Sequence, residues 1–156
     1  MCQTYVLPLI LLTISCLSCT DDTTKVTASC PEYQRSFGGS CYEIVSLQLT
    51  FFSAQAWCEQ RGGHLAFIPD EETYYFLQKH LDPRKDIWFG AAFLASKDLQ
   101  YSTAVEGNYS RWVTSPQPGA ACGHIVRDSG FQWEATVDCN KKLPFICQNG
   151  MYLTKA

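Results

Sequence analysis

The 156-residue chain lacks the features that mark several protein classes. It has no basic stripe, since 12 Lys and Arg residues are interspersed with 15 Asp and Glu residues for a formal net charge of −3, which argues against nucleic acid as a partner. It has no internal repeat and no low-complexity tract. Its longest apolar run, residues 6–17, is too short for a bilayer span, which needs about 20 apolar residues. We therefore expect no membrane-spanning helix.

The same apolar run fits the central region of a secretory signal, followed by small residues where a peptidase could cut. No Lys or Arg precedes the run, which departs from the usual pattern; the alternative is a buried N-terminal strand. We predict a signal peptide over residues 1–19 and a secreted, extracellular protein. A cut after Cys19 leaves six of the nine cysteines, whereas an earlier cut leaves Cys19 as a spare thiol able to link two chains.

The six remaining cysteines are the most informative feature present. In a secreted domain they are expected to be oxidised and to close loops in an irregular fold. With 46% apolar and 13% aromatic residues, the chain can also bury a proper core. We assign residues 20–29 to a polar, Thr-rich linker, residues 30–148 to one domain and residues 149–156 to a C-terminal tail. The six cysteines are Cys30, Cys41, Cys58, Cys122, Cys139 and Cys147.

Two helices are expected in the first half of the domain. Thr50 is a plausible N-cap for the first helix, which Gly62 and Gly63 end. Asp70 caps the second helix, and Pro83 stops it. The inward-facing positions at helical spacing are Phe51, Ala54, Trp57 and Cys58 in the first helix and Tyr74, Leu77 and Leu81 in the second, whose last turn includes Lys79 and His80.

Short strands account for the rest of the domain. A hairpin is predicted over residues 33–37 and 41–47 around a Gly-Gly turn, and further strands over the ranges 87–94, 123–126, 131–133 and 143–147. Residues 95–121 have little periodicity, and a loop of that length in a small domain is usually functional. The fold class is therefore α+β: two helices, a small antiparallel sheet and a long irregular loop region.

Taken with the cysteines, the runs Trp88-Phe89-Gly90-Ala91 and Gly62-Gly63-His64-Leu65-Ala66 resemble the C-type lectin-like domain in its long form. The resemblance covers residues 30–147 and implies three disulfides. Their pairing is taken from the resemblance, because six cysteines alone leave it open. Within the family, residues 62–81 are most similar to the lectin module of polycystin-1-like membrane proteins, so the chain could be a secreted relative or a truncated receptor fragment. The implied pairs are Cys30–Cys41, Cys58–Cys147 and Cys122–Cys139.

Family members that bind sugar do so through calcium, which takes about 6–8 oxygen ligands. The family's first ligand triplet corresponds here to Gln117-Pro118-Gly119, which keeps one side-chain oxygen, and Ala120 and Ala121 offer none before Cys122. The second stretch corresponds to Trp133-Glu134-Ala135, which keeps one carboxylate, and the longer spacing to Cys139 could bring Asp138 into the site. We therefore expect calcium binding to be weak or absent.

The remaining candidates are aromatic residues and one modification site. Trp57, Trp88 and Trp133 are expected in the core, whereas Tyr109 and Trp112 are better placed to stack on a ligand. Asn108 begins the chain's N-glycosylation triplet. The leading function is calcium-independent or weakly calcium-dependent carbohydrate recognition, and the alternative is a protein–protein interaction module. We expect no enzymatic activity and no cofactor, because the domain's cysteines have structural partners and the histidines show no metal spacing.

Overall fold

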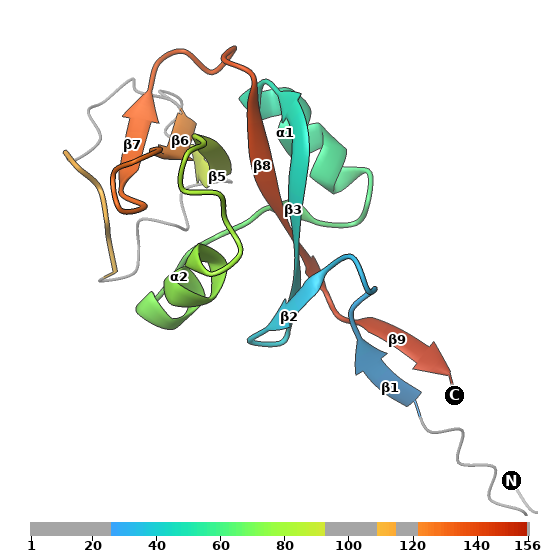
Figure 1. Cartoon of the computed structure of the whole chain (residues 1–156). Helices are drawn as coiled ribbons and strands as arrows, with labels where there is room; N and C mark the ends of the chain where they lie inside the picture. Colours follow the sequence, from blue (N-terminus) through green and yellow to red (C-terminus); the bar gives the residue numbers. More distant parts are fainter. Residues whose placement is uncertain (1–25, 93–108, 115–121, 156) are drawn as a thin grey trace, which may run out of the picture.

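The computed structural model describes residues 26–92, 109–114 and 122–155. These residues form two helices and nine strands (Figure 1), so the α+β class is confirmed. In chain order the elements are β1 (Val26–Ser29), β2 (Arg35–Phe37), β3 (Ser40–Leu49), α1 (Phe51–Glu59), β4 (His64–Leu65), α2 (Glu71–Gln78), β5 (Ile87–Ala92), β6 (Cys122–Ile125), β7 (Trp133–Thr136), β8 (Leu143–Gly150) and β9 (Tyr152–Lys155).

Seven of these strands form one sheet in the order β2-β3-β8-β5-β6-β7, with β4 paired to β8 off that path. The long antiparallel pair β3 and β8 forms its centre, as Figure 1 shows. β5 runs parallel to β8, with Trp88 opposite Phe145, so the sheet is mixed rather than purely antiparallel. β5 also pairs with β6, and β6 with β7, which places the predicted ligand stretch at Trp133–Thr136 on the edge strand.

Both helices begin at the predicted N-caps. The Thr50 hydroxyl accepts a hydrogen bond from the Ser53 amide at 3.3 Å, and Asp70 Oδ1 accepts one from the Thr73 amide at 2.7 Å. Each side chain thereby satisfies a backbone donor that the first helical turn leaves without a partner. α2 ends at Gln78, so Leu81 is buried as expected but lies in the connection after the helix.

The predicted strand over residues 131–133 is displaced toward the C-terminus, since β7 covers Trp133–Thr136. The reason is the backbone of the preceding turn. Asp128, Gly130 and Phe131 have φ values of 53°, 73° and 64°, which belong to the left-handed region and not to a strand. The β6–β7 connection is therefore a tight turn that includes Phe131.

Large aromatic side chains fill the core on both sides of the sheet centre. Trp88, Trp133, Phe89 and Phe145 are each fully buried, which confirms Trp88 and Trp133 as core residues. Trp88 Nε1 donates a hydrogen bond to the Leu49 carbonyl at 3.0 Å, which satisfies its one polar atom. Burying such side chains contributes roughly 1.5–3 kcal/mol each.

Three disulfides connect the cysteines as the family resemblance implies: Cys30–Cys41, Cys58–Cys147 and Cys122–Cys139. The Cα atoms of the three pairs lie 5.5, 5.5 and 5.7 Å apart. The second pair joins α1 to β8 across a separation of 89 residues, and the third joins β6 to the segment after β7. The third disulfide thereby fixes the segment after β7 to β6.

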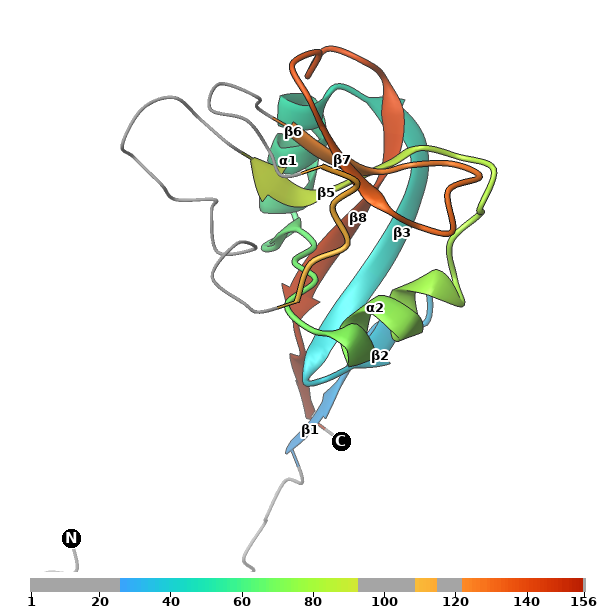
Figure 2. The same cartoon turned by 90° about the vertical axis from the view of Figure 1, so that its left-hand side faces the viewer.

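A two-stranded ribbon formed by β1 and β9 extends away from the domain in both views (Figures 1 and 2). The sequence assigned these residues to a linker and a tail, whereas the structure pairs Val26 with Lys155 through Ser29 with Tyr152. The two ends of the described chain therefore lie side by side. Within the described residues, neither helix is long and apolar enough to cross a membrane.

Candidate functional site

The predicted ligand residues fall into two groups. Gln117, Pro118 and the glycosylation candidate Asn108 lie outside the residues that the structure describes. The other four are described, and they lie on or next to the edge strand β7: Tyr109, Trp112, Glu134 and Asp138.

Glu134 is held in place by the ladder between β6 and β7, in which it lies opposite His124. The neighbouring Trp133 side chain is fully buried, while the Glu134 side chain is 55% exposed. This follows from strand alternation, which sends successive side chains to opposite faces. The sequence Trp133-Glu134 therefore fixes the core with one residue and presents a carboxylate to solvent with the next.

Glu134 lies over a buried histidine. His124 Nε2 is 3.6 Å from Glu134 Oε2, a separation too long for a hydrogen bond, and the His124 side chain is only 5% exposed. The His124 ring packs edge-on against Trp88, with 5.6 Å between centroids. Its Nδ1 is buried and has no hydrogen-bond partner among the described residues.

Burial lowers the pKa of His124, because removing the imidazolium from water disfavours its charged form. The Asp86 carboxylate opposes this effect, Lys141 adds to it, and Glu134 opposes it more weakly. His124 is therefore neutral at pH 7. Among the described residues, this neutral histidine is therefore no cationic partner for Glu134.

Asp138 is engaged in its own turn. Its Oδ1 accepts a hydrogen bond from the Asn140 amide at 3.2 Å, and its backbone N–H donates to Thr136 Oγ1 at 3.1 Å. A side chain that bonds the backbone two residues onward stabilises a turn. Among the described residues, no group of three or more His, Cys, Asp or Glu side chains is arranged to hold a metal ion. The oxygen donors that this part of the site offers to calcium are thus few.

Tyr109 and Trp112 are half-buried and pack against the core, in contrast to the exposed stacking surface that the sequence favoured. The Trp112 ring centroid lies 5.6 Å from that of Trp133, and the Tyr109 centroid lies 5.8 Å from it. The Tyr109 hydroxyl is buried without a partner among the described residues. These two side chains therefore extend the core next to Trp133.

The physical reason is that their segment docks on β7. The Val113 amide donates to the Trp133 carbonyl, and the Trp133 amide donates to the Arg111 carbonyl, both at 2.9 Å. These bonds hold the segment along the sheet edge. The absence of a side chain at Gly123 makes room for Trp112, since an added Cβ at Gly123 would lie 3.1 Å from the Trp112 ring.

Arg111 and His124 are the polar residues of this region that sequence reasoning missed. The Arg111 guanidinium lies 4.2 Å above the Tyr74 ring, a cation–π arrangement. His124 could have been recognised as buried, because it occupies a predicted strand between apolar neighbours. Its position opposite Glu134 depends on strand register, which the sequence did not define.

Solved structures place this arrangement in one class of fold. The mouse scavenger receptor C-type lectin carbohydrate-recognition domain superposes with a TM-score of 0.67 at 24% identity, covering 80% of this chain and 100% of that chain. A calcium-independent type II antifreeze protein also superposes with a TM-score of 0.67, at 20% identity over 81% of this chain and 98% of that chain. At such low identities these likenesses show the fold alone, which is the C-type lectin fold.

Sequence comparison then identifies the family. The model of the lectin C-type domain matches residues 47–149, and the chain belongs to that family. Regenerating islet-derived protein 3-gamma of Rattus norvegicus is 28% identical over 145 residues, which cover 82% of this chain and 81% of that protein. Bovine lithostathine is 28% identical over 139 residues, with 77% of each chain covered.

Proposed function

We propose that the chain is an exported recognition domain that binds carbohydrate with weak or absent calcium dependence. The weak or absent calcium dependence is inferred from the environment of Glu134. Its exposed carboxylate lies next to a buried, neutral histidine, and Asp138 is engaged in its own turn. A calcium site needs about 6–8 oxygen ligands, and the sequence around Gln117 and Pro118 adds one side-chain oxygen. The charge at this rim is too small for a tight site.

Carbohydrate as the ligand class is supported by the family. The chain belongs to the lectin C-type domain family, and one protein of the same fold is described as a carbohydrate-recognition domain. Another protein of this fold is described as calcium-independent. A retained scaffold with few metal ligands favours direct recognition by hydrogen bonds over recognition through a bound cation.

Several finer assignments belong to this proposal as well. They are the signal peptide over residues 1–19, secretion, a glycan on Asn108, and a ligand site that includes Gln117, Pro118, Glu134 and Asp138. The resemblance of residues 62–81 to the polycystin-1-like lectin module stays a prediction, since the relatives described above are regenerating islet-derived proteins and lithostathines. These relatives carry binding domains, which supports a binding role over an enzymatic one.

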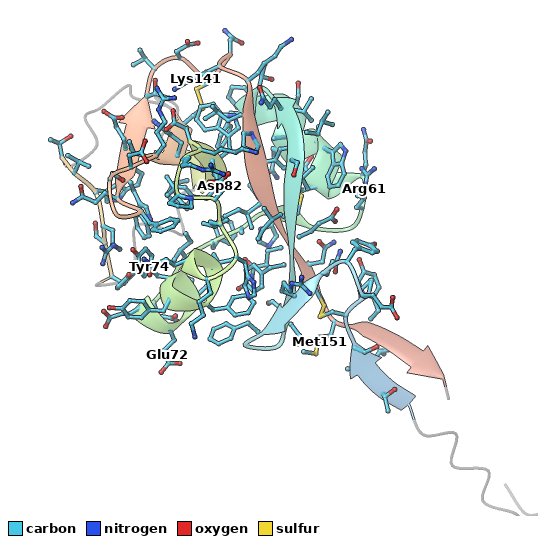
Figure 3. All side chains as sticks on the ribbon, viewed as in Figure 1. Arg61, Glu72, Tyr74, Asp82, Lys141 and Met151 are labelled. Atoms are coloured by element: carbon cyan, nitrogen blue, oxygen red, sulfur yellow. A yellow bond between two sulfur atoms is a disulfide. The ribbon has the colours of Figure 1, made fainter. Side chains whose placement is uncertain are left out.

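The first test is calorimetric titration of the purified domain with calcium, combined with a glycan array read with calcium and with chelator. We expect no saturable heat at sub-millimolar calcium and the same array signals in both conditions. The variant Glu134→Gln tests the site, and Glu72→Gln, an exposed acid on α2 (Figure 3), is the matched control.

The outcomes separate the two functions. Saturable calcium binding that Glu134→Gln removes and Glu72→Gln retains would show that the rim does hold a cation. Silence of the array in both conditions would remove the carbohydrate assignment. A protein partner that is captured equally with chelator and with free sugars would then support the alternative, a protein–protein interaction module.

A further inference from the structure

A basic hollow lies on the domain surface apart from the residues assigned to the loop-region site. Its volume is about 230 Å³, and it is formed by the loop after α2, the β6–β7 turn and the segment leading into β8. Figure 3 labels Lys141 on that last segment and Asp82 on the loop after α2. The charged side chains that line the hollow are Arg84, Lys85, Asp86, Arg127, Lys141 and Lys142.

This lining concentrates positive charge in a chain that is acidic overall. Five of the 12 Lys and Arg residues of the chain line this one hollow, although the formal net charge of the whole is −3. The two adjacent basic pairs, Arg84-Lys85 and Lys141-Lys142, come from segments far apart in the sequence. Folding therefore assembles a cationic surface that no linear basic motif reveals.

Asp86 contributes to the hollow more by connecting its parts than by neutralising its positive charge. Its Oδ2 accepts a hydrogen bond from Lys141 Nζ at 2.8 Å, and its Oδ1 accepts one from the Arg127 backbone amide at 2.9 Å. Burial alone would raise the pKa of Asp86, but these two hydrogen bonds hold it below its usual value. Asp86 therefore stays ionised and fixes the two sides of the hollow to each other.

The other cations are differently engaged. Arg84 pairs with Asp82, with 3.1 Å between Nε and Oδ1. Lys85, Arg127 and Lys142 are exposed and make no ion pair with another described residue. Three exposed cations thus line one concave surface, and none of them is held in an ion pair with a described carboxylate, although Lys85 interacts with Asp82 at longer range.

We propose that this hollow binds the sulfate groups of a sulfated polysaccharide. It is smaller than the cavities of about 300–1,000 Å³ that enclose whole small molecules, so it fits a charged substituent of a larger chain. Arg127 offers a planar fork of donors for a tetrahedral oxyanion, and Lys85 and Lys142 offer point charges. The inference goes beyond the function proposed for the loop region and does not depend on it.

The lining favours a sulfated glycan over a nucleic acid. Single-stranded nucleic acids are bound by basic grooves with aromatic side chains on which bases stack, and no aromatic side chain is among the described residues lining this hollow. The remaining lining is aliphatic and polar, as suits a hydrophilic chain that contacts the protein mainly through its charges.

The experiment measures binding of a size-defined heparin oligosaccharide to the full disulfide-bonded protein by calorimetry, across a series of salt concentrations. The desulfated oligosaccharide and a single-stranded DNA of equal charge are the comparison probes. The test variant is the double substitution Lys85→Gln with Lys142→Gln. The matched control, Arg35→Gln with Lys79→Gln, removes the same charge from exposed positions outside the hollow.

With three ionic contacts, the affinity of the protein for the heparin oligosaccharide should fall roughly 40-fold between about 50 and 200 mM salt, on the basis that counterion release from heparin is similar to that from DNA. The test variant should bind weakly, with a salt dependence of roughly 3-fold over the same range, because one contact remains. The control variant should bind like the parent protein. The desulfated chain should not bind.

Two results would overturn the proposal: equal losses in the test and control variants, or equal affinity for the sulfated and desulfated chains. Equal affinity for the DNA would likewise reject sulfate recognition in favour of non-specific polyanion binding. A glycan array that is silent for neutral sugars removes the loop-region function and leaves this result unaffected, so the two proposals fail separately.

Discussion

The buried His124 predicts a specific dependence of stability on pH. Its pKa is lowered in the folded protein, chiefly by burial, from an ordinary value of 6.5. The unfolded chain therefore binds a proton more readily than the folded protein as the pH falls below about 6.5. Stability is fully present above that value and decreases as the pH falls toward the folded-state pKa.

The size of the effect has an upper bound. One proton changes the free energy of unfolding by at most about 1.4 kcal/mol per pH unit. The unfolded ring is mostly protonated only below about pH 6.5, so the loss between about pH 7.5 and 5.5 is at most about 1.4 kcal/mol. The Asp86 and Glu134 carboxylates reduce the cost of charging the ring, whereas Lys141 increases it. Urea denaturation at the two pH values, followed by tryptophan fluorescence, measures the difference directly.

The variant His124→Phe isolates this contribution. Phenylalanine keeps an aromatic ring against Trp88, carries no proton to titrate and removes the Nδ1 that has no partner among the described residues. We expect the variant to be at least as stable as the parent at about pH 5.5, with a smaller change between the two pH values. An undiminished change in the variant would show that His124 is not its source, and the reasoning about burial would be wrong.

Two further predictions concern the scaffold. Replacing both Cys58 and Cys147 by alanine opens a loop with a separation of 89 residues and should cost about 4.5 kcal/mol, measured by denaturant unfolding; a loss below about 1 kcal/mol would contradict the loop-entropy argument. Gly90→Ala should cost about 1–3 kcal/mol of stability, because the added Cβ would overlap the Leu65 carbonyl oxygen. Gly150→Ala is the control, since its Cβ would meet nothing within 4 Å. Equal melting temperatures of the two variants would refute this steric argument.

The local parts of the fold could be predicted because their signals are local. Thr50 and Asp70 cap helices through hydrogen bonds to residues three positions onward, which a sequence displays directly. The disulfide pairing followed from the family resemblance, and the structure has the same pairs. Burial of Trp88 and Trp133 followed from their size and their apolar surroundings.

The remaining features depend on contacts between distant residues. β1 and β9 are four residues each, and neither has a partner nearby in the sequence, so their pairing could not be read from periodicity. Phe131 looked like a strand residue, but the turn places it in the left-handed region. Trp112 was expected at the surface of a loop; it is half-buried because its segment hydrogen-bonds to β7.

His124 interacts with residues of both proposed binding sites. Glu134 lies opposite it on the edge strand β7, while Asp86 and Lys141, which line the basic hollow, act on its charge. A neutral His124 ring adds no positive charge near Glu134 or near the hollow, whereas a protonated ring would add positive charge to both. The calcium and heparin measurements are therefore independent of each other only well above the pKa of His124, and both belong at about pH 7.5.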